Sequence, residues 1–210
     1  MLSANSIKYL HDFCTKHWHQ QPDEFPYAIS EWEKLVALHH YANCDLWHLE
    51  DEARTPGASD ATIAETKRKI DKTNQTRNDL VEKLDEALLG YLAQFDLPNP
   101  LEPQHSETPG MIIDRLSILE LKIYHTREEI RRTDAPPGHA DRNRHRPDTL
   151  EKQQGDLRQC LDALWAETMA GQRCFKVYRQ LKMYNDPTLN PAMYGDGGST
   201  PRDRRPDPGH

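Results

Sequence analysis

The sequence has few cysteines, no long apolar run and no excess of basic residues, and each absence excludes a class of protein. Its four cysteines include no C-x-x-C pair, which is the spacing typical of zinc and redox sites. No window approaches the ~20 apolar residues that span a bilayer, and the N-terminal segment has no basic stretch followed by an apolar one. We therefore expect a cytoplasmic protein with buried, reduced thiols and no membrane insertion.

The charge balance is weakly acidic, with 27 basic and 34 acidic residues and a formal net charge of -7. Binding to a nucleic-acid backbone requires a basic patch, so we expect no nucleic-acid partner. The hydrophobic share of 36% is low beside a charged share of 29%. Such a composition is typical of elongated helices that have one apolar stripe and broad polar faces.

Helical periodicity covers most of the chain, and no segment shows the alternation of a strand. A short helix is predicted over residues 5–19. The predicted long helices cover residues 30–54, residues 60–95, a third segment that starts near Ser106 or Thr108, and residues 148–184. The fold class is therefore all-α, a bundle of four long helices plus a short N-terminal helix.

Capping signals support three of these helix starts. Ser30 and Glu33 form an S-x-x-E capping box, and Asp148 with Glu151 repeats the pattern. Pro109 stands in the first turn of the third long helix, where its missing N–H costs nothing. That helix reads GMIIDRLSILELKIYH and is apolar nearly all round, so we expect it to be the central one.

The domain organisation follows from where this periodicity stops. Residues 1–185 are predicted to form one helical domain with a mobile polar loop at 134–147, which contains three prolines. Residues 186–210 are rich in glycine, proline and charge, so we expect a largely disordered tail.

Polar residues recur on helix faces that should be apolar. On a wheel of 100° per residue, the stripe of the helix from Ser30 includes His39, Asn43, Glu50 and Arg54. The next helix places Asn74 and Arg77 on its stripe, with Asn78 and Asp79 beside them. The apolar helix carries Asp114, Arg115 and Ser117, then His125 and Glu128. A buried charge without a partner costs several kcal/mol, so these groups must meet each other or a ligand.

Two interpretations remain open. In the first, the groups pair with each other and set the register of the helices, for example Glu50 with Arg77 and Asp114 with Arg54. In the second, which we favour because three helices contribute and both signs of charge recur, they line a pocket between the helices.

The chemistry of such a pocket has two candidate forms. Acids at Glu50, Asp79, Glu82 and Asp114 would hold a hard cation, for which Mg²⁺ is the candidate. Arginines at 54, 77 and 115 would instead hold a phosphate or carboxylate in bidentate fashion. The pair Glu82-x-x-Asp85 resembles the E-x-x-D pattern of the all-α nucleoside-triphosphate pyrophosphohydrolases, although a solvated helix face is the interpretation we favour for it.

Covalent and di-iron chemistry are not indicated. Ser117 has no base beside it in the sequence, and none of the cysteines lies in a reactive motif. A di-iron carboxylate bundle needs E-x-x-H from two helices, whereas His125 and Glu128 have the reverse order.

Four segments carry a family resemblance. They read LHHYANCDLWHLEDEAR at 38–54, NQTRNDLVEKLDEALL at 74–89, SETPGMIIDRLSILELKIYH at 106–125 and KMYNDPTLNP at 182–191. Together they resemble the bacterial family called domain of unknown function 4254. Its members are uncharacterised, and some lie near genes for surface-polysaccharide glycosyltransferases. The resemblance therefore implies a nucleotide-sugar, sugar-phosphate or lipopolysaccharide context.

The motifs of the family coincide with the polar positions on the wheel. The resemblance carries over these candidates: Asn43, Trp47, His48, Glu50, Asp51, Arg54, Asn78, Asp79, Glu107, Asp114, Arg115, His125, Asn185 and Asp186. For Asn185 and Asp186, which precede a proline, a helix stop is the simpler interpretation.

Two functional hypotheses follow. The first is a small-molecule protein, in which Arg54, Arg77 and Arg115 hold an anionic phosphorylated or sugar-nucleotide ligand. Its catalytic candidates are Glu50, Asp79 and Asp114, as metal ligands or general base, and its further ligand-binding candidates are His39, Asn43, Trp47, His48, Asp51, Asn78 and His125. The second is a non-catalytic interaction module that docks on a partner such as a glycosyltransferase. The oligomeric state and the resident metal are left open by the sequence.

Overall fold

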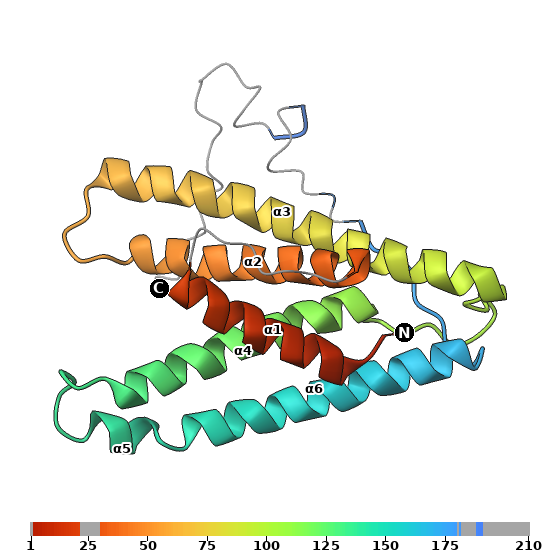
Figure 1. Cartoon of the computed structure of the whole chain (residues 1–210). Coiled ribbons are helices and arrows are strands. Elements are labelled where there is room, and N and C mark those ends of the chain that lie inside the picture. The colour runs from red at the N-terminus through yellow and green to blue at the C-terminus, as the bar shows by residue number, and fades with distance from the viewer. Residues whose placement is uncertain (1, 22–29, 180, 182–187, 191–210) are drawn as a thin grey trace, which may run out of the picture. The chain divides into compact units, whose positions relative to one another are not determined.

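The computed structural model describes residues 2–21, 30–179, 181 and 188–190. Its elements are α1 (Ala4–Gln20), α2 (Glu31–Glu52), α3 (Asp60–Leu92), the 3₁₀ turn η1 (Ala93–Phe95), α4 (Pro109–Arg131), α5 (His139–Asn143) and α6 (Arg146–Met169) (Figure 1). The described residues contain no strand beyond one isolated bridge between Gln104 and Cys174. The predicted fold class, four long helices plus a short N-terminal helix, is confirmed.

Two helix pairs make up the bundle. α2 packs along α3, α4 packs along α6, and α1 runs across both pairs (Figure 1). α4 contacts α1, α2, α3, α5 and α6, so it is the central helix, as its apolar sequence predicts.

The helix starts follow the predicted capping chemistry. The Ser30 hydroxyl accepts a hydrogen bond from the Glu33 N–H at 3.2 Å, and the Glu33 carboxylate accepts one from the Ser30 N–H at 2.9 Å. Thr108 caps α4 by accepting from the Met111 N–H at 3.2 Å, and Pro109 occupies the first turn. Because these side chains satisfy amide groups that have no partner within the helix, each fixes the residue at which its helix begins.

α3 begins at Asp60, as predicted, and its cap is Ser59, whose hydroxyl accepts from the Thr62 N–H. The predicted start of the last helix was wrong. α6 begins at Arg146 with Pro147 in its first turn, so Asp148 lies inside that turn and does not cap it. Proline pre-sets the first-turn geometry, which explains the earlier start.

The predicted extent of the last helix was also wrong. α6 ends at Met169, and Gly171 follows in the left-handed region with φ +69. Glycine adopts this conformation without steric cost, so it stops the helix although apolar residues continue beyond it. One of these, Phe175, still packs into the core from outside the helix. The loop predicted at 134–147 is also partly helical, since it contains α5.

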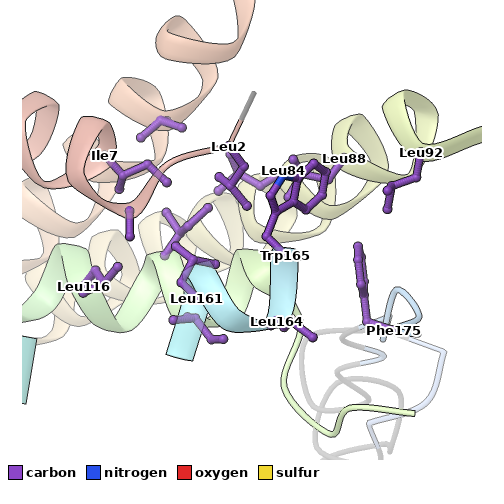
Figure 2. Packing of buried hydrophobic residues seen from close by; sticks show 14 residues of the cluster. Leu2, Ile7, Leu84, Leu88, Leu92, Leu116, Leu161, Leu164, Trp165 and Phe175 are labelled. Carbon is purple, nitrogen blue, oxygen red and sulfur yellow. The ribbon is translucent and has the colours of Figure 1, made fainter. Parts of the chain in front are cut away.

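The main apolar core lies where α1, α3, α4 and α6 meet (Figure 2). Its buried members include Ile7, Leu84, Leu88, Leu92, Leu116, Leu161, Leu164, Trp165 and Phe175. Burying one such side chain contributes about 1.5–3 kcal/mol, so this cluster supplies much of the free energy that holds the helices together.

The helices all belong to one compact unit, Met1–Tyr178, and the rest of the chain, Arg179–His210, forms a second unit. The candidates Asn185 and Asp186, and most of the predicted tail, lie outside the described residues. In the described part of the chain, no helix combines the length and apolar character needed to cross a membrane. Cys14, Cys44 and Cys174 are buried as predicted, whereas Cys160 is exposed.

Candidate functional site

A cavity of about 520 Å³ opens between α2, α3 and α4. It is lined by Asn43, Leu46, Trp47, Glu50, Asp51, Arg54, Ile70, Asn74, Arg77, Ile118 and Leu121. Asn43, Trp47, Glu50 and Arg54 recur every three or four residues along α2 and the turn that follows it, so they lie on one face. Six of the candidates named from the sequence line this cavity: Asn43, Trp47, Glu50, Asp51, Arg54 and Arg77.

Glu50 and Arg54 pair with each other at the rim. Their side chains are 46% and 69% exposed and form an ion pair one helical turn apart. The predicted pairing of Glu50 with Arg77 was therefore wrong, because Arg54, four residues on in the turn after α2, is within reach and Arg77 lies across the cavity on α3. An exposed pair of this kind contributes little to stability.

Arg77 reaches from α3 toward Asp114 of α4. Its Nε lies 3.8 Å from Asp114 Oδ1, which is ion-pair distance but too long for a hydrogen bond. That Nε is buried and has no hydrogen-bond partner in the described part of the chain. Another N–H of the guanidinium donates to the Asn78 side chain at 3.3 Å. The predicted pairing of Asp114 with Arg54 was wrong, since Arg77 takes that place.

Asp114 belongs to a hydrogen-bonded group beneath the cavity. Its Oδ1 accepts from His39 Nε2 at 2.9 Å and from Asn43 Nδ2 at 3.0 Å. Burial raises the pKa of Asp114, but the His39 hydrogen bond, the Arg77 charge and the Asn43 amide together bring that pKa below its ordinary value. The carboxylate is thus held in its ionised form as an acceptor.

His40, next to His39 in sequence, continues the group toward α1. Its Nδ1 lies 2.7 Å from Ser117 Oγ and its Nε2 lies 2.8 Å from Thr15 Oγ1. Asn43 also donates to Ser117 Oγ, at 3.0 Å. We call these side chains the buried polar network, whose members are Thr15, His39, His40, Asn43, Asp114 and Ser117.

The buried polar network does contain a base beside Ser117, which the sequence did not reveal. However, Ser117 and His40 have no exposed surface, so no substrate can reach the hydroxyl. Burial, followed by the neighbouring His39, lowers the pKa of His40 to about 3. The pair is therefore suited to fixing the helix register rather than to nucleophilic catalysis.

His11 completes the α1 side of this region. Its ring stacks on His40 with centroids 4.3 Å apart, and it is fully buried. Burial and the two neighbouring histidines place the pKa of His11 well below its ordinary value, so the ring is neutral at neutral pH.

The structure separates several other candidates from the cavity. Asp79 is exposed, accepts from Gln75 at 2.7 Å, and is not among the residues that line the cavity with Glu50. Arg115 pairs with Glu107 at 2.7 Å and lines a different cavity, between α4 and α6. The three arginines therefore do not converge on one anion.

The two remaining candidates, His48 and His125, lie beside the cavity in a cluster of rings. The ring of His125 stacks on Trp47 with centroids 4.6 Å apart and planes 9° apart. The ring centre of His48, which is exposed, lies 6.0 Å from that of His125. Burial, then the nearby His19, lowers the pKa of His125.

Asp85 was misread from the sequence as part of a solvated face. It is 2% exposed, and its Oδ1 accepts from the Gly110 N–H at 2.7 Å at the start of α4. Burial raises its pKa to about 6. A Cβ on Gly110 would lie 2.7 Å from the Val81 carbonyl oxygen, so only glycine permits this helix crossing. Asp85 therefore holds α4 against α3, and with Glu82 it does not form an open cation site.

Several important residues escaped the sequence analysis. Thr15 and His40 occupy helical positions that carry no motif, and their partners lie 25 or more residues away. The polar residues Asp114 and Ser117 on an otherwise apolar helix signalled that such partners exist.

Comparison with known proteins identifies the family. No curated protein and no solved structure matches the chain. One family model, described as protein of unknown function (DUF4254), matches residues 33–177, which is more than half of the chain and includes the cavity and α2 through α6. The chain therefore belongs to the family designated domain of unknown function 4254.

Proposed function

We propose that the cavity between α2, α3 and α4 binds an anionic small molecule with a phosphate or diphosphate group, such as a sugar nucleotide. The observation that carries this proposal is Arg77. Its guanidinium lies at the cavity wall, 25% exposed, and its buried Nε has no hydrogen-bond partner among the described residues. A guanidinium binds phosphate through two parallel N–H donors, and Arg77 has donors to spare.

Other lining residues suit the remaining parts of such a ligand. Trp47 offers an aromatic surface for a base or sugar, and its ring is held by the stack on His125. Asn74 supplies an amide that would orient hydroxyl groups. Arg54 adds a second positive charge at the rim.

A catalytic role would add a metal ion to this binding site. Glu50 and Asp51 are the carboxylates that line the cavity, and carboxylates bridged to substrate phosphates are the usual protein ligands of Mg²⁺. Hydrolysis or group transfer at the phosphate would then rest on these two acids, with Glu50 freed from Arg54 to act as base. The Asp114 carboxylate would help to position the Arg77 guanidinium through their ion pair.

The test is isothermal titration calorimetry of the full chain with UDP-glucose and with inorganic pyrophosphate, each with and without MgCl₂. Arg77→Gln should weaken binding at least about tenfold, which corresponds to about 1.4 kcal/mol. The matched control is Arg115→Gln, which lies outside the cavity and should bind as wild type does. Binding that is absent in wild type, or equal in both variants, contradicts the proposal. Release of phosphate from the same probes tests the catalytic role.

A non-catalytic interaction module is the second candidate, and one observation favours it. A second cavity of about 600 Å³ is mainly apolar, and its walls include Trp32, Leu35, Leu38, Tyr91 and Trp165. Exposed apolar surface of this kind is typical of sites for protein partners, of which a glycosyltransferase is the one implied by the family context. Under this hypothesis Leu38→Glu abolishes partner binding and leaves the calorimetry above unchanged.

A further inference from the structure

A second group of side chains, apart from the phosphate-binding residues, gathers where the C-terminal end of α1 meets α4. It consists of His19 from α1 and of His125 and Glu128, one turn apart on α4. One potential ligand atom from each residue lies within 4.8 Å of the other two. Two ligand atoms on a tetrahedral Zn²⁺ are about 3.4 Å apart. Side-chain rotations that move these atoms by about 1 Å would therefore bring all three to ligand distance from one ion.

The hydrogen bonds of His19 prepare its Nε2 as a ligand. Its Nδ1 lies 2.7 Å from the Thr15 carbonyl oxygen, and a carbonyl only accepts, so Nδ1 carries the proton. Nε2 then has a free lone pair. That atom is buried and has no hydrogen-bond partner among the described residues. A metal-binding histidine characteristically donates its other N–H to a carbonyl or carboxylate, as His19 does.

His125 and Glu128 complete the arrangement. His125 Nδ1 and Glu128 Oε2 are 3.1 Å apart, which is a hydrogen bond in the metal-free protein and is also close to the spacing of two ligands on one ion. His125 therefore offers Nδ1 to the ion and carries its proton on Nε2. The buried His19 Nε2, which has no partner among the described residues, is costly unless something binds it.

The neighbouring rings hold the two imidazoles in position. His19 packs on Tyr124 with ring centres 4.3 Å apart, and His125 lies parallel to Trp47. The ring centres of His19 and His125 are themselves 5.0 Å apart, and the two ring planes are inclined by 63°. Rigid support of this kind reduces the entropy lost when an ion binds.

We propose that His19, His125 and Glu128 bind a divalent transition-metal ion, with Zn²⁺ as the best match. Two imidazoles and one carboxylate are a ligand set that Zn²⁺ accepts, and harder cations such as Mg²⁺ prefer oxygen ligands alone. Three protein ligands leave the fourth position to water. This proposal does not rest on the phosphate ligand proposed above. None of the three residues lines that cavity, and the test uses the metal alone.

The test begins with the full chain stripped by a chelator and titrated with ZnCl₂ alone by calorimetry. Wild type should bind one equivalent that raises its melting temperature, since an ion that binds only the folded state stabilises it. His19→Gln and His125→Gln should each weaken binding by more than the about 10- to 100-fold that loss of an outer partner costs. The matched control, His145→Gln, alters an exposed histidine elsewhere and should bind as wild type does.

Co²⁺ substitution keeps the test decisive if a variant fails to fold. Wild type with Co²⁺ should show the visible absorption of a four-coordinate ion with nitrogen and oxygen ligands. A thiolate-to-cobalt band would assign the metal to a cysteine such as the exposed Cys160 and would overturn the proposal. No zinc binding by wild type, or equal binding by His19→Gln and His145→Gln, would overturn it as well.

Discussion

Two sets of polar side chains, one within α2 and one at its C-terminal end, have opposite environments. In the N-terminal half, His39, His40 and Asn43 belong to the buried polar network, where they form hydrogen bonds with side chains of α1 and α4. At the C-terminal end, Glu50 and Arg54, which follows the last helical residue, line a cavity and pair with each other. A satisfied buried group sets the register of the helices, whereas a polar group beside open space is available to a ligand. One helix thus serves stability at one end and, on our proposal, binding at the other.

The largest expected effect concerns the close contact of Gly110, at the start of α4, with α3. This contact positions α4, which contributes to both the buried polar network and the cavity. Gly110→Ala would put a Cβ 2.7 Å from the Val81 carbonyl oxygen, which is backbone and cannot rotate away. We expect a loss of about 3 kcal/mol, at the upper end for overpacked sites, measured by urea denaturation followed by circular dichroism. Gly155→Ala on α6 is the matched control, because a Cβ there meets nothing within 4 Å. Equal stability of the two variants would mean that α3 and α4 are not in this close contact.

The buried polar network should be the next most sensitive region. Ser117→Ala removes the partner of both His40 Nδ1 and Asn43 Nδ2 in a site with no exposed surface. Leaving buried polar atoms unsatisfied should cost about 2 kcal/mol in the same denaturation experiment. A neutral result would show that water reaches this region, and the contrast between the two halves of α2 would disappear.

The pH dependence of stability tests His40 separately. Its pKa is about 3 in the folded state against an ordinary 6.5, so below pH 6.5 only the unfolded state binds the proton. The contribution of His40 is therefore lost as the pH falls. Between pH 7 and pH 5 the stability advantage of wild type over His40→Gln should shrink by about 2 kcal/mol. The comparison with the variant cancels other groups, including Asp85, whose raised pKa acts in the opposite direction. A constant difference would contradict a buried, neutral His40.

The sequence was most informative where one residue and its local neighbours decide the structure. The capping box of Ser30 and Glu33 and the Thr108-Pro109 start are local, so their prediction was confirmed. The end of α6 was missed because the apolar period continues past Gly171, whose left-handed backbone stops the helix. Hydrophobic spacing does not register a turn of that kind.

For the site, the wheel identified the correct faces but not the pairs across them. Polar residues at 43, 50, 54 and 77 do line one cavity. Which acid pairs with which arginine depends on how far one helix is shifted along its neighbour. The hydrophobic period of a single helix carries no information about that shift. The same reason explains Asp85, whose partner at the start of α4 is 25 residues away.

The most direct test of the contrast is one chemical change made on both sides of it. Asp114→Asn and Glu50→Gln each remove one carboxylate charge, the first from the buried polar network and the second from the cavity rim. Urea denaturation should show that Asp114→Asn lowers the free energy of unfolding by about 3 kcal/mol. The substitution leaves His39 and the buried Arg77 Nε without the carboxylate charge that they face. Glu50→Gln should change by less than about 0.5 kcal/mol, as befits an exposed pair. Equal losses, or a larger loss for Glu50→Gln, would contradict the division of α2 into a structural half and a binding half.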